Sequence, residues 1–109
     1  MDTEYAVVFA AHGRADLLAV RRWLNQPGSG LRARLRLAKI SRALTELRFA
    51  PHRWPIGDHP GVRERAVEGH RIFYRVDEVQ RTVNVLRVFG PFQNRAPVSY
   101  THLTLPTTP

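Results

Sequence analysis

Residues 69–76 read GHRIFYRV, a stretch typical of a β-strand that carries two arginines among aromatic and aliphatic side chains. Successive side chains of a strand point to opposite faces of the sheet, so Arg71, Phe73 and Arg75 are expected on one face. The aliphatic Ile72 would lie on the other face, against the core. A strand that only filled a core would need neither arginine, so the open face is a candidate binding surface.

The patterns around this strand predict an α+β domain in which a two-helix hairpin packs on one face of a small, antiparallel-rich sheet. His12 and Gly13 are expected to end the first strand. The expected elements, in chain order, are a strand over 5–10, helices over 15–24 and from about 31, and strands over 62–68, 70–77 and 82–89. The last two strands, joined by residues 78–81, would form an antiparallel hairpin.

The second predicted helix has the strongest periodicity in the chain. Its apolar stripe consists of Ala33, Leu37, Ile40, Leu44 and Leu47. A basic face lies beside this stripe, formed by Arg32, Arg36 and Lys39. Solvation is the simpler interpretation of such a face, and a binding surface is the alternative.

Length and charge limit the possible functions. The 109 residues suit one domain with a single modest core. The 17 basic and 9 acidic residues give a net charge of +8, and Lys39 is the only lysine. Because the guanidinium group suits phosphate and carboxylate, the expected partners are nucleic acid, a nucleoprotein surface or an acidic protein segment. For any single surface arginine, the simpler explanation is that arginine is the usual basic residue of proteins encoded by a GC-rich genome.

Several classes of protein are excluded or disfavoured. The absence of cysteine excludes disulfides and thiol catalysis. The N-terminus is acidic where a signal peptide needs positive charge, and no segment reaches the roughly 18 apolar residues that span a bilayer. We therefore expect a cytoplasmic protein. The five histidines lack metal-ligand spacing, and no phosphate loop or nucleophile motif is present, so no metal or cofactor is expected.

Residues 97–109, PVSYTHLTLPTTP, differ from the rest of the chain. They are rich in threonine and proline, carry no charge and follow neither a helical nor a strand period. They resemble the translated sequencing-adapter read-through that ends some gene predictions. We therefore expect residues 1–96 to form the domain, residues 97–109 to be an unstructured, non-native tail, and the native residues after Arg95 to be missing.

Neighbouring strands are expected to bring further arginines to the open face. Strict alternation in the last strand would group Arg87 and Phe89 with Val83 and Val85. The candidate binding side chains are Arg63, Arg65, Arg71, Phe73, Arg75, Arg87 and, beyond the last strand, Arg95. Bases or peptide groups could stack on the aromatic ring between them. The alternative is that the arginines form cross-strand salt bridges with Glu64, Glu68 and Asp77.

The segment ADLLAVRRWL in the first helix and residues 68–95, EGHRIFYRVDEVQRTVNVLRVFGPFQNR, resemble the toxins of the RelE/ParE superfamily from bacterial toxin–antitoxin modules. The resemblance covers about residues 4–95. Its most specific part is the β-hairpin of GHRIFYRV and VNVLRV, which follows a two-helix hairpin in the sequence. It implies a small growth-inhibiting protein, of the kind that stabilises plasmids, neutralised by an antitoxin whose extended segment wraps it.

One branch of this superfamily enters the ribosomal decoding site and cuts mRNA. Cleavage by attack of the 2′-OH needs a base, an acid and cations for the developing charge. By motif match, Arg71 corresponds to the conserved hairpin arginine of the superfamily, and Arg65 and Arg95 are further catalytic candidates, with Arg63 as a phosphate contact. The acid or base could be Glu64, Glu68 or His70, although strand alternation places all three on the helix-facing side.

The other branch poisons DNA gyrase and cuts nothing itself, so it needs only a contact surface. The segment DLLAVRRWL is closer to this branch, and GPFQNR after the last strand lacks the histidine or tyrosine of many ribosome-dependent members. The sequence therefore favours gyrase poisoning. Ribosome-dependent mRNA cleavage and an inactive member that only binds its antitoxin are the alternatives.

Overall fold

The computed structural model describes residues 4–90, which form the predicted α+β architecture. The elements in chain order are β1 (Ala6–Phe9), α1 (Ala11–Leu24), α2 (Gly30–Glu46), β2 (Arg63–Val67), β3 (His70–Asp77) and β4 (Thr82–Phe89). The predicted hairpin of the last two strands is confirmed, with the expected bounds for both. The expected tail over 97–109 lies outside the described residues.

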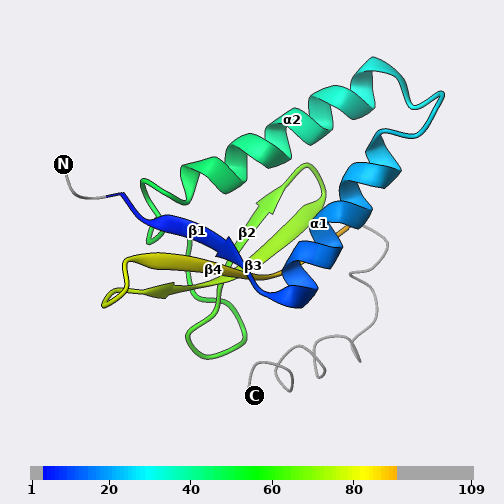
Figure 1. Ribbon diagram of the computed structural model, residues 1–109. Helices are drawn as coiled ribbons and strands as arrows, with labels where there is room; N and C mark the ends of the chain where they lie inside the picture. The colour runs from blue at the N-terminus through cyan, green and yellow to red at the C-terminus, as the bar shows by residue number, and fades with distance from the viewer. Residues whose placement is uncertain (1–3, 91–109) are drawn as a thin grey trace.

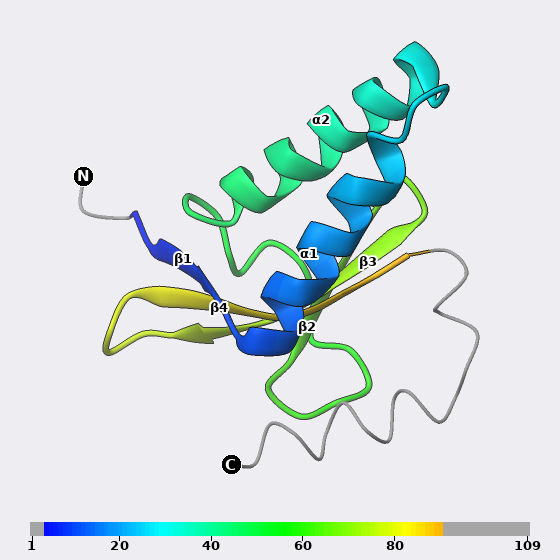
Figure 2. The same ribbon diagram turned by 45° about the vertical axis from the view of Figure 1, so that its right-hand side comes forward.

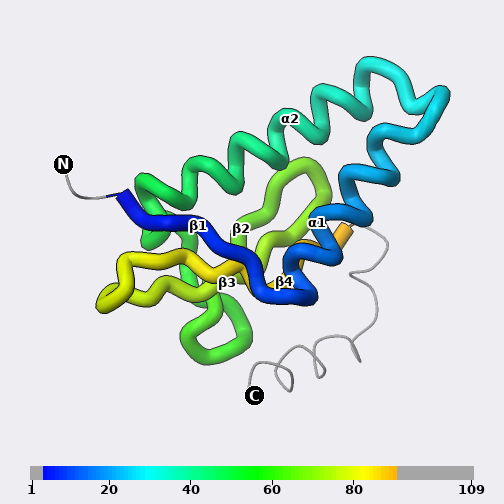
Figure 3. Tube along the Cα trace, viewed as in Figure 1, coloured from blue at the N-terminus to red at the C-terminus, as the bar shows by residue number. Residues whose placement is uncertain are grey.

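The four strands form one sheet in the order β1-β4-β3-β2. β4 is antiparallel to β3 and parallel to β1, and β2 pairs with β3 as a second hairpin. Both helices lie on the same side of the sheet, and the turn that joins them projects beyond it (Figures 1 and 2). The first and last strands of the described residues, β1 and β4, therefore lie side by side, as the tube in Figure 3 shows.

The main core lies between the helices and the sheet. The apolar stripe predicted for α2 faces it: Ile40 and Leu47 are fully buried, and Leu37 packs against the cluster. The strands contribute Ile72, Tyr74, Val83, Val85 and Val88, all fully buried. Burial of this apolar surface is the main term that stabilises the domain.

Tyr74 ties the loop after α2 to the centre of the sheet. Its hydroxyl donates a hydrogen bond of 2.6 Å to the carbonyl oxygen of Pro51. Burial raises the pKa of Tyr74 to about 12, although the nearby Arg63 and Arg65 act in the opposite direction. The phenol is therefore held in its neutral, hydrogen-bonding form at ordinary pH.

Helix α1 begins at Ala11, so the expectation that His12 and Gly13 end the first strand is wrong. Glycine is a poor helix former, but here it permits close contact. A Cβ atom at Gly13 would lie 2.3 Å from the carbonyl oxygen of Val85. The first turn of α1 can rest directly on the backbone of β4 because position 13 has no side chain.

A β-bulge interrupts the pairing of β3 with β4. Tyr74 pairs with Val85, but its neighbour Phe73 pairs with Arg87. Leu86 is therefore an extra residue in β4 with no partner in β3. Beyond it, the side chains of β4 lie on the opposite faces from those that strict alternation predicts.

The bulge overturns the expected grouping of side chains in the last strand. Val83 and Val85 face the main core, as alternation requires, but after the bulge Val88 joins them there. Arg87 and Phe89 lie on the other face of the sheet, across from β3 side chains of that face. The expectation that they share a face with Val83 and Val85 is therefore wrong.

Candidate functional site

Arg63 and Arg65 lie on the helix-facing side of the sheet, which corrects the expectation that they join the open face. In the β2–β3 register they stand opposite Tyr74 and Ile72, two residues of the main core. Directly opposed residues share a face, so the register decides their position. The guanidinium of Arg63 donates a hydrogen bond of 2.7 Å to the carbonyl oxygen of Trp54 and thereby holds the loop before β2.

Arg65 joins three segments of the chain. Its Nη1 atom lies 3.0 Å from the carbonyl oxygen of Ala43 and 2.7 Å from Oε1 of Glu46, near the C-terminal end of α2. Its guanidinium carbon also lies 4.0 Å from the centre of the Trp54 ring. Only 15% of the side chain is exposed. A cation is favourable at a helix C-terminus and over an aromatic face, so these contacts of Arg65 stabilise the fold.

Arg87 is bound by a carboxylate of α1. Its Nε atom lies 2.7 Å from Oδ2 of Asp16, and its Nη2 atom lies 3.2 Å from Oδ1. The same Oδ2 accepts a hydrogen bond of 2.9 Å from the backbone N–H of Val88. This bidentate pair fixes α1 to β4 beyond the end of β1. Because two guanidinium nitrogens of Arg87 already bind Asp16, the side chain has little capacity left to bind a target.

Sequence reasoning missed the role of Asp16, although a signal was present. Asp16 precedes Val20 and Leu24 by one and two helical turns, so all three lie on the same side of α1. All three are buried. A carboxylate on the buried side of an amphipathic helix requires a cation or donors, and that requirement predicts a partner such as Arg87.

Phe73 is fully buried, which corrects the expectation of an accessible aromatic ring between the arginines. It belongs to a second small core with Val62, Leu86 and Phe89. The rings of Phe73 and Phe89 meet edge to face, with centroids 5.4 Å apart. The bulge residue Leu86 and the loop residue Val62 help to bury this part of the sheet, so nucleobases cannot stack on Phe73.

Arg71 lies on the open side of the sheet beside Glu64. Its Nη2 atom is 3.0 Å from Oε1 of Glu64, and 39% of its side chain is exposed. Glu64 stands opposite Phe73, so the expectation that Glu64 faces the helices is wrong. The second carboxylate oxygen accepts a long hydrogen bond of 3.4 Å from the backbone N–H of Asp58. The alternative of a salt bridge between the strands is therefore confirmed for this pair.

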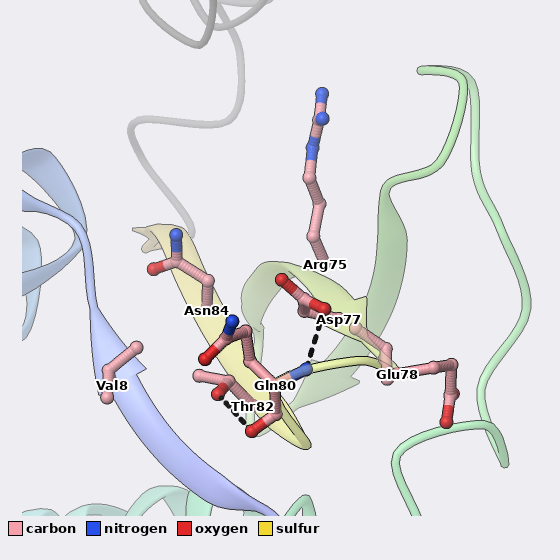
Figure 4. A pocket seen from close by; sticks show the side chains of 8 residues that line it. Val8, Arg75, Asp77, Glu78, Gln80, Thr82 and Asn84 are labelled. Carbon is pink, nitrogen blue, oxygen red and sulfur yellow. Dashed lines mark hydrogen bonds between the residues drawn. The ribbon is translucent and has the colours of Figure 1, made fainter.

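Arg75 lies further along the same face and is exposed. Within residues 4–90 its guanidinium forms no hydrogen bond or ion pair. It borders a shallow depression of about 500 Å³, lined by Val8, Arg75, Val76, Asp77, Glu78, Gln80, Thr82 and Asn84. Figure 4 shows the Arg75 side chain extending outward from the polar groups around the turn between β3 and β4. Of the predicted binding residues that the structure describes, Arg71 and Arg75 remain accessible on this face.

A polar cluster anchors the turn that closes one end of the depression. The hydroxyl of Tyr5 donates a hydrogen bond of 2.9 Å to Glu78, and the other oxygen of Glu78 contacts the imidazole of His52. Burial, followed by the interaction with Glu78, raises the pKa of Tyr5. Arg81 lies over the Tyr5 ring, 4.4 Å from its centre. The depression is therefore built on a well-anchored turn.

The residues considered as acids or bases are not free beside Arg71. His70 is buried, and its Nδ1 atom lies 3.0 Å from the carbonyl oxygen of Glu68. The carboxylate of Glu68 lies 3.5 Å from Lys39 and 3.8 Å from Arg36, so its predicted position on the helix side is confirmed. Among residues 4–90, the acid or base candidate next to Arg71 is thus Glu64, with which it is already paired.

Two negative findings concern the described part of the chain. No helix formed by residues 4–90 is long and apolar enough to cross a membrane. The same residues contain no group of three or more histidine, cysteine, aspartate or glutamate side chains placed to hold a metal ion. The candidate Arg95 lies outside the described residues.

Similar solved structures identify the class to which this arrangement belongs. The RelBE2 toxin–antitoxin complex of Mycobacterium tuberculosis is 25% identical, with a TM-score of 0.60, over 80% of this chain and 98% of that one. The chromosomal ParDE system of P. aeruginosa is 18% identical, with a TM-score of 0.63, over 82% and 98%. A doubly substituted mutant of the E. coli toxin RelE in the free state is 15% identical, with a TM-score of 0.62, over 94% and 97%. The fold is therefore that of the RelE/ParE toxins.

The sequence narrows this class to one family. Residues 7–90 match the family model described as the ParE toxin of the type II toxin-antitoxin system, parDE. The chain belongs to this family and is a toxin of a type II toxin–antitoxin system, so the resemblance noted in the sequence is confirmed. A search of curated proteins found no significant match.

Proposed function

We propose that this toxin inhibits growth by binding and poisoning DNA gyrase through the open face of its sheet, with Arg71 and Arg75 as contact residues. The observation that carries the proposal is the contrast in chemistry on this face. It offers two accessible guanidinium groups, whereas the carboxylate beside Arg71 is engaged in an ion pair. A poison that acts by binding needs cationic contacts and no acid–base pair, and the family match is to the ParE toxins.

The Arg71–Glu64 pair also favours a second candidate, ribosome-dependent cleavage of mRNA. The carboxylate is the described acid or base candidate next to the guanidinium that would stabilise a phosphorane. Substrate binding would have to draw Arg71 toward phosphate and release Glu64 as a base. Because this route requires the ion pair to open first, we place it behind gyrase poisoning.

We also propose that an antitoxin protein binds this chain. Several similar solved structures are toxin–antitoxin complexes, including RelBE2 of Mycobacterium tuberculosis and RelBE of E. coli. The net charge of +8 suits an acidic partner segment. Such a segment could cross the open face and neutralise Arg75, which forms no ion pair within residues 4–90.

The test is a supercoiling assay with purified bacterial gyrase, relaxed plasmid and ATP, run beside primer-extension mapping of mRNA in a purified translation reaction. We expect inhibition of supercoiling and no new mRNA ends. The double substitution Arg71→Ala/Arg75→Ala should raise the inhibitory concentration by about tenfold or more. Arg22→Ala is the matched control, because Arg22 is an exposed arginine on α1, and it should change that concentration by less than about twofold.

Three outcomes separate the hypotheses. Cuts that appear on translated mRNA and vanish with Arg71→Ala would establish the nuclease and overturn the gyrase proposal. Inhibition of gyrase that Arg22→Ala weakens as much as the double substitution would show general charge attraction instead of a defined surface. A folded chain that acts on neither target would leave a member that only binds its antitoxin.

A further inference from the structure

The face of α2 that points away from the sheet carries an apolar stripe. Leu31 and Leu35, one helical turn apart, are 67% and 54% exposed, and the exposed Ala38 follows at the next turn. These residues lie opposite the buried stripe that contains Ile40. In Figures 1 and 2, no other helix or strand formed by residues 4–90 covers this side of α2. We call Leu31, Leu35 and Ala38 the outer α2 stripe.

The surroundings of the outer α2 stripe are strongly basic. Arg32, Arg34 and Arg42 are exposed, and within residues 4–90 none of them forms an ion pair. The single acidic residue of α2, Glu46, lies at its last position and pairs with Arg65. This face therefore combines apolar side chains with cations that lack carboxylate partners in the described part of the chain.

We propose that the outer α2 stripe is a docking surface for an acidic amphipathic helix of a partner protein. Two leucines one turn apart fit between the apolar side chains of a second helix packed along α2. Glutamate or aspartate side chains flanking that apolar face would pair with Arg34 and Arg42. The surface lies on the far side of the helices from Arg71 and Arg75, so the inference does not depend on which target the open sheet face binds.

The chemistry of the surface favours this occupant over two others. A second copy of the chain would bring the same unpaired arginines against Arg34 and Arg42, and the like charges would repel. RNA or DNA would satisfy the arginines, but it would leave Leu31 and Leu35 without an apolar partner. An acidic helix with an apolar stripe satisfies both the cations and the leucines.

The probe is a synthetic amphipathic helix of about 18 residues, with leucine along one face and glutamate on its flanks, labelled for fluorescence anisotropy. We expect saturable binding that weakens as salt rises from ~50 to ~300 mM, because the ion pairs are exposed. Leu31→Glu/Leu35→Glu should weaken binding by about tenfold or more. Arg34→Glu/Arg42→Glu should do the same, whereas Val79→Glu, at the 88% exposed turn residue, should change affinity by less than about twofold.

Three comparison ligands complete the test: the same peptide with lysine for glutamate, the same peptide with serine for leucine, and a short single-stranded RNA. We expect weak or no binding of all three. Equal binding of the serine peptide, or affinity unchanged by Leu31→Glu/Leu35→Glu, would overturn the proposal. Tight RNA binding that depends on Arg34 and Arg42 but not on the leucines would assign the surface to nucleic acid instead.

Amide shift mapping by NMR keeps the test independent of any substitution. With the unmodified, isotope-labelled chain, the glutamate peptide should shift amide signals along residues 31–42 and leave those of β3 unchanged. Shifts confined to the sheet would place the peptide on the open face and overturn the assignment to α2. Circular dichroism and thermal unfolding would verify that each variant retains the fold.

Discussion

The two faces of the sheet use arginine in opposite ways. On the helix-facing side, Arg65 donates to Ala43 and Glu46 and lies against Trp54, with 15% of its side chain exposed. On the open side, Arg75 extends into solvent without a partner in residues 4–90. The residue type is the same, so the difference lies in the register that decides which face each side chain reaches. Substitutions on the two sides should therefore separate stability from target binding.

The largest effect should come from the contact that fastens α1 to β4. Asp16→Ala would remove the carboxylate that pairs with the largely buried guanidinium of Arg87. It would also leave the backbone N–H of Val88 without its hydrogen-bond acceptor. Breaking a buried pair from one side costs about 3–5 kcal/mol, so we expect a loss of that order in the free energy of unfolding. Urea denaturation measures it. A loss near zero would show that Asp16 and Arg87 are not a buried structural pair.

Alkaline pH should produce the next largest effect, through Tyr74. The pKa of Tyr74 is about 12 in the folded protein and 10.0 for an unperturbed tyrosine. Its stabilising contribution is complete below pH 10 and is lost as pH rises toward 12, by about 2–3 kcal/mol. Tyr74→Phe should cost about 1 kcal/mol at pH 7 and reduce the alkaline loss. An identical alkaline loss in that variant would assign it to other groups.

Arg65→Ala sharpens the comparison on the helix side. It removes the hydrogen bond to Ala43, the ion pair with Glu46 and the contact with Trp54, and should lower the free energy of unfolding by about 1–3 kcal/mol. Thermal and urea unfolding measure this loss. Gyrase inhibition by the fraction that remains folded should be unchanged. Loss of inhibition without loss of stability would instead make Arg65 a target contact.

Arg75→Ala should have the smallest effect on stability and a clear effect on function. The side chain is exposed and has no partner in the described chain, so the Tm should shift by less than about 2 °C. Inhibition of gyrase should weaken nonetheless, which a supercoiling titration would detect. A large drop in Tm would mean that Arg75 contributes to the fold and would weaken the contrast between the two faces.

Much of the fold follows from local patterns in the sequence. The apolar stripe that ends at Leu47 predicts α2, and alternation with turn residues predicts β3 and β4 with the observed bounds. The beginning of α1 was not predictable in this way. Gly13 looks like a helix breaker locally, and the reason for its presence is the backbone of β4, far along the chain.

The candidate site was predicted less well because it depends on register. The position of Arg71 and Arg75 on the open face follows from alternation in β3. Because of the bulge at Leu86, Arg87 lies on the opposite face of the sheet from the one that strict alternation predicts. Nothing in the local sequence marks that extra residue. Asp16 and Arg87 are far apart in sequence, so their pairing depends on tertiary structure even though each side chain signals a need for a partner.

The position of β1 has a consequence for the synthesis of the chain. β1 is made first, yet its partner in the sheet is β4, the last described strand. A nascent chain can close the β2–β3 hairpin before β4 emerges, but β1 and the first turn of α1 gain their contacts only after β4 has left the ribosome. A chain interrupted before Thr82 therefore lacks the strand on which β1 and α1 assemble, so premature termination should release fragments without a completed fold and without toxic activity.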